Sequence, residues 1–558
     1  MRARLLIVIA AVAVALGLGL CMRAAAQLER DPGAQTPALG APGLNLAGGA
    51  IFVIKGHGWG HGIGMSQYGA LGYARRGVTY DKILAHYYPG TQLGPAPVAK
   101  VRVLLAANRQ RVTISSDAPF QVKDAFGEKH ELAAGAHAFG PGLRLKLDPT
   151  DTEQKPLIGP LVFMAGLSPL EFERPYRGQL QVSAVGTRLQ VVNLVGLEGY
   201  VKGVVPSEMP YYWPTEALKA QAVVARSYAL STRRSGGFDL YSDTRSQVYR
   251  GIDAERPSTN DAVTATAGKV LLYAGQVART YFFSTSGGRT ASPADVWPTG
   301  KPVPYLVSVD DPYDSLSPYH DWGPYTYKPT TLGHKLKVPG RLVDVRTQAG
   351  LSGRVKLVTA VGTLGQKLIP GTDARRELGL RSTWFVVGVL SLAAPTIPVV
   401  YGSELTLSGI ARGLTGVVVQ GRSAASGWQP QANVAPAKDG SFSFVTKPKQ
   451  TTLYRLAAGS VTSGSVRAWV APVVRFYPVD TPTRLRGLVR PLLPGTKVDI
   501  QRLEPATGAW TRVASTKVDE TGNFEASFRL TTGQYRARVP ASRGFAAGMS
   551  AVLQVLTQ

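Results

Sequence analysis

Cysteine is almost absent from this chain of 558 residues, which contains Cys21 and no other cysteine. One cysteine cannot form an intramolecular disulfide or supply the ligands of a cysteine-based metal site, so both are excluded. Hydrophobic residues make up 44% of the sequence and charged residues 18%, so the chain is not disordered by composition. It can bury ordinary hydrophobic cores, and it is several times longer than a typical domain of about 100–150 residues.

Acidic residues are scarce as well. The sequence has 36 of them against 62 lysines and arginines, which gives a formal net charge of +26. An excess of this size predicts affinity for a polyanion. Nucleic acid, anionic lipid and anionic cell-wall polymer are the candidates.

The first residues narrow this choice. A short basic stretch, MRAR, precedes sixteen apolar residues, LLIVIAAVAVALGLGL, and Ala24-Ala25-Ala26 forms an A-x-A cleavage pattern before Gln27. We interpret residues 1–26 as a secretory signal peptide. The alternative is an uncleaved membrane anchor, since the run is near the lower length for a spanning helix. Leu20 is too large for the small residue that usually precedes a lipidated cysteine.

Cleavage after residue 26 removes three arginines and no acid, so the exported chain keeps a charge of +23. We expect an exported protein of the cell envelope or the extracellular space, or a membrane-anchored one if the signal is not cleaved. Anionic cell-envelope polymers are the expected partners. Nucleic acid is not.

The rest of the sequence divides into segments that differ in composition and hydrophobic pattern. Residues 27–50 are rich in Gly, Pro and Ala and are typical of a linker. Residues 51–390 contain alternating apolar runs such as LQVVNLVG, which predict strands, and helical patterns at about 197–205 and 214–234. This arrangement predicts a mainly β domain with a few buried helices.

A sequence repeat follows. SGWQPQANVAPAKDGSFSF resembles GAWTRVASTKVDETGNFEASF, with Trp428 matching Trp510 and Phe442 matching Phe524. Short strands and frequent turns predict two small all-β, sandwich-like domains over 391–470 and 471–558. The whole chain is therefore predicted to be α+β. The two repeats can bind glycan or serve as spacers, and the sequence does not choose between these roles.

The helical stretch that begins near Pro214 is apolar on nearly every face, which is typical of a buried helix. It nevertheless carries Lys219, Gln221 and Arg226. A buried cation without a partner is costly, so Lys219 and Arg226 should face carboxylates, carbonyls or a polar cleft. A structural ion pair and a substrate-facing role are both open on this pattern.

Glu208 lies just before this helix, between Pro206 and Pro210 in a stretch that we predict to be a stiff loop. Aromatic and apolar neighbours, including Trp213, would raise the pKa of its carboxyl group, as a general acid requires. Aromatic faces also suit sugar rings. The alternative is an ordinary glutamate on a surface loop.

The stretch GHGWGHGIGMSQYGA (residues 56–70) places His57 and His61 four residues apart on a backbone rich in glycine. Two histidines at this spacing bind metal readily on a helix, but here the spacer is Gly-Trp-Gly and no acid follows. No G-K-[ST] follows the glycines, and GMSQYG does not fit G-x-S-x-G, which argues against a phosphate loop and a serine hydrolase. We therefore expect no metal and no cofactor.

Several blocks together resemble the stage II sporulation protein D (SpoIID/LytB) family. They are PSEMP-x-x-W-P-x-EALKAQAVVARSYAL, SQVYRG, STSGGRT and GHGWGHGIGMSQYGA, and the resemblance runs across about 51–390. Family members of the sporulation type are lytic transglycosylases of peptidoglycan. The resemblance implies that Glu208 is the catalytic acid/base, which protonates the MurNAc-GlcNAc glycosidic oxygen and then takes the proton of the muramic C6 hydroxyl. A 1,6-anhydro ring results, and one carboxyl group does both jobs.

The resemblance also implies a substrate-binding set. Glycines let the backbone turn sharply, so that the polar side chains of the glycine-histidine stretch can face sugar hydroxyls. The expected substrate-binding residues are His57, His61, Ser66, Gln67, Trp213, Lys219, Gln221, Arg226, Ser284, Ser286, Gly287 and Gly288.

The sequence departs from the family pattern in three places. The glycine-histidine block usually ends the domain, whereas here it comes first and ARRELGLRSTWFVV closes the domain, as after a circular permutation. This predicts that residues near Ile51 lie close to those near Val387. SDTRSQVYRG lacks the cysteines and histidine that suit zinc in some relatives, and Phe283 replaces a histidine that many relatives carry.

Three functions compete on this basis. The first is an exported peptidoglycan lytic transglycosylase, which the intact PSEMP block favours. The second is a non-catalytic, glycan-binding modifier of a cell-wall amidase, as LytB-type relatives are described. The third, a purely structural envelope protein, leaves Lys219 and Arg226 unexplained.

Overall fold

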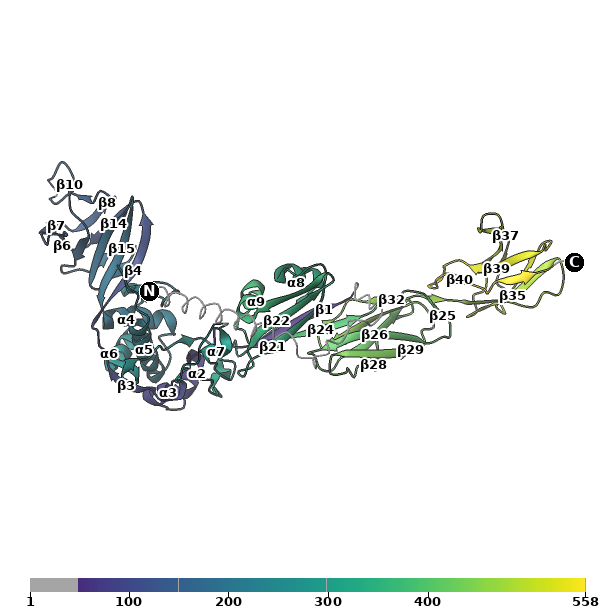
Figure 1. The fold of residues 1–558 in the computed structure, drawn as a ribbon, viewed down its shortest axis with the longest axis horizontal. Helices are drawn as coiled ribbons and strands as arrows, with labels where there is room; N and C mark the ends of the chain where they lie inside the picture. Colours follow the sequence, from purple (N-terminus) through teal and green to yellow (C-terminus); the bar gives the residue numbers. More distant parts are fainter. Residues whose placement is uncertain (1–48, 149, 298, 557–558) are drawn as a thin grey trace, which may run out of the picture.

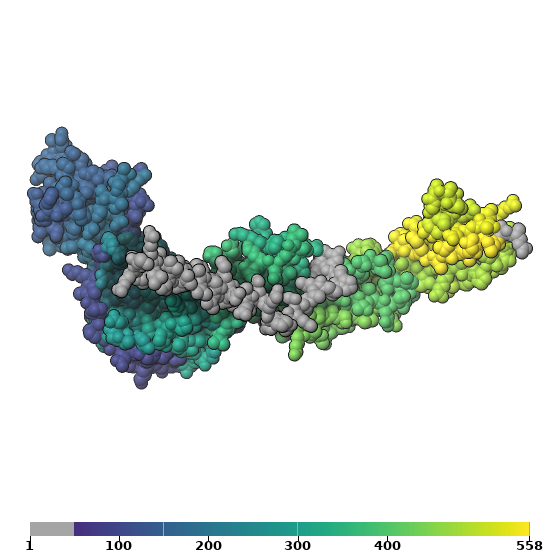
Figure 2. Space-filling model, in the orientation of Figure 1, coloured from purple at the N-terminus to yellow at the C-terminus, as the bar shows by residue number. Residues whose placement is uncertain are grey.

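The computed structural model describes residues 49–148, 150–297 and 299–556. The predicted signal peptide and nearly all of the predicted linker lie outside these residues. Within them, no helix combines the length and the apolar character needed to cross a bilayer. The described part is an elongated row of lobes (Figures 1 and 2). Strands dominate and helices gather in two places, which confirms the predicted α+β class.

The first lobe, which we call the sheet lobe, contains a seven-stranded sheet (Figure 1). Its strands alternate apolar and polar residues, as in LQVVNLV, so that one face packs on the core. The spatial order is β16 (Leu240–Tyr241), β4 (Lys100–Arg109), β15 (Arg188–Gly196), β14 (Gln179–Val185), β11 (Leu161–Met164), β6 (Phe120–Lys123) and β7 (Lys129–Leu132).

The second lobe, the helical lobe, holds the two predicted helices. Its helices are α2 (Gln67–Ala74), α3 (Tyr80–Tyr87), α4 (Leu197–Glu208), α5 (Thr215–Ser231), α6 (Pro257–Ala265) and α7 (Pro293–Val296). Helix α5 packs against α2, α3, α4 and α6. This explains why its sequence is apolar on every side: neighbours surround it.

Helix α4 is longer than predicted, because Pro206 lies inside it and Glu208 is its last residue. The expectation of a loop rested on the helix-breaking effect of proline. Here the apolar residues upstream, from Leu197 to Val205, are buried and hold the helix in place. The amide of Met209 still donates to the carbonyl of Val205, which closes the final turn. Glu208 is thus presented from a helix end.

Strand β1 (Ile51–His57) is the point where distant parts of the chain meet. It lies between β20 (Asp321–Tyr327) and β24 (Phe385–Leu392) in one sheet, and Ile54 pairs with Val387. The predicted closeness of residues near Ile51 and Val387 is confirmed.

Both faces of β1 are covered, which explains its apolar run IFVI. Phe52 and Ile54 enter one hydrophobic core, built with β21 (Leu342–Ala349), β22 (Val355–Gly362), α8 (Pro329–Leu336) and α9 (Gly371–Leu378). Val53 points to the opposite face and enters the core of the next unit.

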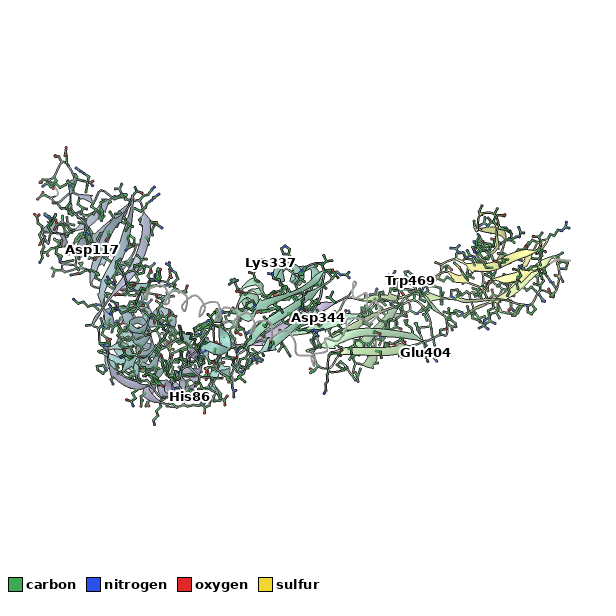
Figure 3. All side chains as sticks on the ribbon, viewed as in Figure 1. His86, Asp117, Lys337, Asp344, Glu404 and Trp469 are labelled. Atoms are coloured by element: carbon green, nitrogen blue, oxygen red, sulfur yellow. The ribbon has the colours of Figure 1, made fainter. Side chains whose placement is uncertain are left out.

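The sheet that contains β1 continues without a break into the first sequence repeat. Strand β24 also pairs with β26 (Leu405–Arg412), which pairs with β29 (Ser441–Thr446). The predicted boundary at 390/391 therefore falls inside a strand. Arg412 on β26 reinforces the junction through an ion pair with Asp344 on β21, which Figure 3 labels.

The two repeats have matching strand patterns. In the first, β27 (Val418–Ser423) lies between β28 (Ser426–Asn433) and β30 (Thr452–Ala458); in the second, β36 (Lys497–Leu503) lies between β37 (Trp510–Lys517) and β39 (Gly533–Val539). The second has its own hydrophobic core, formed with β35 (Arg484–Arg490) and β38 (Asn523–Ser527).

A surface feature is repeated as well. The guanidinium of Arg455 lies 4.1 Å from the ring centre of Trp428. That of Arg536 lies 4.3 Å from the ring centre of Trp510. These are cation–π pairs at equivalent positions of the two sheets.

Candidate functional site

Glu208 is the acid around which the site is built. Its side chain is half-buried at the end of α4, and Oε1 accepts a hydrogen bond of 2.9 Å from the backbone amide of Val248. Burial raises the pKa of the Glu208 carboxyl group, and the bond from Val248 opposes this effect only in part. Among the described residues, no charged side chain is a cause of this shift. A lone carboxyl group in such surroundings keeps its proton at a higher pH than an exposed one.

Three glutamines lie around Glu208. Gln67 Nε2 donates to the Glu208 backbone carbonyl over 2.9 Å and lies 3.5 Å from Gln221 Oε1. Gln247 Nε2 donates to the carbonyl of Ala225 and to the hydroxyl of Tyr200. Gln221 Nε2 and Gln247 Oε1 are buried and lack a hydrogen-bond partner among the described residues. Gln221 and Gln247 are 0% and 1% exposed, so these polar atoms lie beneath the surface, and of the predicted residues Gln67 contacts the backbone of Glu208 directly.

Sequence reasoning missed Gln247, although it lies in the SQVYRG block. It also missed Tyr228 on α5, whose hydroxyl pKa is raised by burial and, among smaller causes, by the charge of Glu208. Gln247 could have been found from the sequence, because it lies in the SQVYRG block and a buried polar side chain needs a hydrogen-bond partner.

The STSGGRT block (residues 284–290) and the glycine-histidine block (residues 56–70) both bind a buried carboxylate, that of Asp314. It accepts hydrogen bonds from the amides of Ser286 (3.0 Å) and Gly287 (2.8 Å) and from the hydroxyl of Ser66 (3.0 Å). His320 Nδ1 lies 3.0 Å from Asp314 Oδ2. Ser66 also caps helix α2.

This corrects the prediction that Ser66, Ser286 and Gly287 face the substrate. Their polar groups bind Asp314, and Ser66 and Ser286 have no exposed surface. The prediction failed because the partner carboxylate is distant in the sequence and has no motif of its own. Asp314 and His320 are therefore residues that hold the two loops together and that sequence reasoning did not find.

Ser284 and Gly288 remain half-buried at the ends of the same segment. Ser284 Oγ lies 3.1 Å from the hydroxyl of Thr285, and its carbonyl accepts from the amide of Tyr68. The Gly288 amide donates to Ser286 Oγ. Ser284 keeps a polar group close to the surface, whereas Gly288 shapes the turn with φ of 108°.

The two histidines of the opening motif are placed differently. His57 Nδ1 lies 2.5 Å from Asp321 Oδ1, and its side chain is 42% exposed. His61 accepts from the amide of Ile63 and lies among the rings of Tyr281, Phe283 and Trp297. Burial first, and then nearby arginines, lower the pKa of His61 to about 4, so its ring is neutral at neutral pH. His57 and His61 are both partly exposed, and His57 is paired with Asp321.

Comparison with known proteins identifies the segment that carries Glu208. Residues 185–273 match a family model described as SpoIID, Stage II sporulation protein. Stage II sporulation protein D of Bacillus subtilis (strain 168) is 34% identical over 219 residues, which cover 36% of this chain and 62% of that protein. The chain carries a SpoIID domain.

Two further relatives are similar over shorter stretches. The amidase enhancer of Bacillus subtilis (strain 168) is 41% identical over 114 residues, 20% of this chain and 15% of the relative. A protein of Brachyspira hyodysenteriae (strain ATCC 49526 / WA1) that is described as uncharacterized is 42% identical over 138 residues, 24% of this chain and 37% of its own. The chain thus spans less than two thirds of these relatives' lengths. A solved cytokine receptor complex aligns over 27% of this chain at 13% identity with a TM-score of 0.19.

Within the SpoIID domain, Arg226 is a structural residue and not a substrate-binding one, which corrects the prediction. Its side chain has no exposed surface and forms a bidentate pair with Glu198, at 3.0 and 2.8 Å. It also donates to the carbonyls of Lys269 and Val263. Of the two roles that the sequence left open, the ion pair is the one observed.

Lys219 is similarly engaged. Its Nζ lies 2.8 Å from Glu216 Oε1, one helical turn earlier in α5, and 5.9 Å from the ring centre of Tyr80. Trp213 is only 8% exposed and packs edge-on against Tyr68 with ring centres 5.0 Å apart. The aromatic rings open to solvent beside Glu208 are instead Tyr211 and Tyr212, at 50% and 75% exposure.

Among the residues that the structure describes, no three His, Cys, Asp or Glu side chains are grouped closely enough to hold a metal ion. The segment that suits zinc in some relatives here provides Gln247 and the amide of Val248, and both serve the surroundings of Glu208. The segment that matches the SpoIID model thus presents one partly buried carboxyl group with a raised pKa, that of Glu208.

Proposed function

We propose that this protein is an exported peptidoglycan lytic transglycosylase and that Glu208 is its single acid/base. It cleaves the MurNAc-GlcNAc bond of the glycan strand and leaves 1,6-anhydro-MurNAc ends. The observation that carries the proposal is the partly buried Glu208 carboxyl group at the end of α4, whose pKa is raised by burial.

The type of glycoside cleavage depends on how many carboxyl groups take part. Hydrolytic glycosidases use two carboxyl groups, separated by about 5–9 Å, one of which acts as nucleophile or activates water. Among the described residues, no second acid is a cause of the raised pKa of Glu208. A transglycosylase needs only one carboxyl group, because the C6 hydroxyl of the substrate replaces water as the nucleophile.

The proton moves twice through the same side chain. Protonated Glu208 first donates to the glycosidic oxygen as the bond to the anomeric carbon breaks. The resulting carboxylate then accepts the proton of the C6 hydroxyl while that oxygen attacks the anomeric carbon. Both steps need a carboxyl group whose pKa lies closer to neutral than usual, and the half-buried helix end supplies it.

The second candidate function is modification of a cell-wall amidase, together with glycan binding. The similarity to a relative named amidase enhancer favours it. In that case the exposed aromatic rings would bind glycan and Glu208 would not react. The net charge of +26 suits anionic cell-envelope polymers in either case.

The experiment compares the purified protein with a Glu208→Gln variant on isolated glycan strands, with and without stem peptides. Asp261→Asn serves as the matched control, because Asp261 is an exposed carboxylate of the same lobe. Soluble products are identified by mass spectrometry. The proposal predicts products lighter by one water than hydrolysis products, from the protein and the control but not from Glu208→Gln.

Two other results would decide against it. Products that contain the added water would identify a hydrolase. Unchanged glycan strands, with faster peptide release by an added amidase, would establish the amidase-modifier function instead.

A further inference from the structure

Three arginines next to the glycine-histidine stretch have no carboxylate partner among the described residues. Arg354 is fully buried, donates from Nη2 to the carbonyl of Ser286 over 3.1 Å, and leaves Nε and Nη1 unpaired. Arg375 donates from Nε to the carbonyl of Leu380. The side chain of Arg381 forms no hydrogen bond or ion pair with a described residue, and its Nε is buried. Unpaired cations in such positions are costly.

The nearby acids are already occupied. Asp314 binds the two loops described above, and Asp321 pairs with His57. Asp295 accepts from the amide of Ser352. Burial, and then the charge of Arg375, lower the pKa of Arg354 to about 10, and the charges of Asp295 and Asp314 oppose this effect only in part.

Arg381 is the one of the three that reaches the exposed aromatic surface. Its guanidinium carbon lies 4.1 Å from the ring centre of Tyr319 and 5.3 Å from that of Trp59. Trp59 is 40% exposed and meets Tyr319 edge-on, with ring centres 4.5 Å apart. Two rings thus lie against a guanidinium that forms no hydrogen bond with a described residue, and a planar guanidinium suits a planar anion such as a carboxylate.

Backbone hydrogen bonds connect this surface to the segment that contacts Glu208. The amide of Trp59 bonds to the carbonyl of Thr285, and the amide of Tyr68 bonds to that of the preceding residue, Ser284. Tyr68 therefore lies next to Trp59 along one segment, and its hydroxyl is close enough to Tyr319 to interact with it electrostatically. On the other side, Tyr68 packs on Trp213, in the segment that follows Glu208.

The amide of Gln67, the residue before Tyr68, holds the Glu208 backbone. The backbone of Glu208 is thus linked to the segment of Gln67 and Tyr68. The segment that bonds to Tyr68 also bonds to Trp59, whose ring lies against Arg381.

We propose that Arg381, with Trp59 and Tyr319, forms a subsite for a sugar that carries a free carboxylate, and that this subsite positions an acidic glycan strand across Glu208. The inference deepens the proposed function and rests on it for the identity of the strand. A guanidinium binds a carboxylate through two parallel hydrogen bonds, and the exposed face of Trp59 is open to the ring of the same sugar. Arg381 thereby takes the role that the sequence suggested for Arg226.

Binding is measured by calorimetry in the full chain with Glu208→Gln, so that no ligand is cleaved. The two ligands are a MurNAc-GlcNAc oligosaccharide with free carboxylates and a neutral chitin oligosaccharide of the same length. Adding Arg381→Gln should weaken binding of the acidic ligand about tenfold or more and leave the neutral ligand unchanged. Arg341→Gln, which removes an exposed arginine of the same lobe, is the matched control and should change neither.

Arg381→Lys keeps the charge but loses the planar fork, so it should recover part of the affinity for the acidic ligand. It also serves as the test if Arg381→Gln does not fold. Equal loss of both ligands, or no loss of the acidic one, would overturn the subsite. Because binding is measured without turnover, a failure of the subsite is distinguishable from a failure of the proposed reaction.

Discussion

The buried ion pair between Arg226 and Glu198 makes an asymmetric prediction about stability. The Arg226 side chain has 0% exposure, whereas Glu198 is 37% exposed. Glu198→Gln leaves a guanidinium buried without a counterion, and breaking a buried pair in this way costs about 3–5 kcal/mol of unfolding free energy. Arg226→Met leaves a carboxylate that water reaches, together with two carbonyls that lose a donor, which costs about 1–3 kcal/mol.

The double variant should be more stable than Glu198→Gln alone, because methionine removes the uncompensated charge. Differential scanning calorimetry measures the effect: for a domain of a few hundred residues, the Glu198→Gln loss corresponds to a fall in Tm on the order of 10 °C. Hydrogen exchange of helix α5 locates it. An Arg226→Met variant at least as unstable as Glu198→Gln, or additive losses in the double variant, would refute the reasoning. If Arg226→Met instead raised the KM for glycan without changing stability, Arg226 would be a substrate-binding residue.

Three further predictions concern Glu208, Gly287 and the pair of Trp510 and Arg536. Because burial raises the pKa of the Glu208 carboxyl above its usual 4.5, the folded state favours the protonated form, and the stability from this group is lost as pH rises through the raised value. Glu208→Gln should therefore resist urea better than the unchanged protein at pH 8, with the difference shrinking at pH 4; an advantage that grows toward pH 4 would contradict this. Gly287→Ala should cost about 2–4 kcal/mol, since φ is 80° and a Cβ would lie 2.6 Å from its nearest neighbour, whereas Gly186→Ala, with φ of 59° and open space, should cost only about 1–2 kcal/mol. Equal losses of Tm in these two variants would argue against close packing at Gly287. A double-mutant cycle on Trp510 and Arg536 should give a coupling of about 0.5–1 kcal/mol by urea unfolding, and zero coupling would remove the cation–π contact.

The elements of the fold followed the local patterns closely. The helix predicted at 214–234 runs over Thr215–Ser231, and the alternating run LQVVNLVG forms β15. These succeeded because helix and strand periodicity depend on neighbours a few residues apart. The prediction of a loop around Glu208 was wrong because the packing of α4 overrides the local effect of Pro206. A short stretch of sequence contains no information about that packing.

The site was predictable in part. Glu208, Gln67 and Gln221 are brought together as expected from their blocks. The roles of Ser66 and Ser286 were not, because their hydroxyl and amide groups find Asp314, which lies 248 residues from Ser66. Any buried polar group must be satisfied by some partner, but the sequence does not say by which one.

The sequence alone determined the scarcity of cysteine and acid, the strand and helix periods, the repeat and the blocks that mark the SpoIID domain. It also placed one glutamate among aromatic residues. Only the tertiary structure decided that β1 joins two cores, that Glu198 pairs with the buried Arg226, and that Arg381 has no carboxylate partner among the described residues. The reason is physical: periodicity and composition act over a few residues, whereas the partner of a charge is chosen within a few ångströms between segments that only the folded chain brings together.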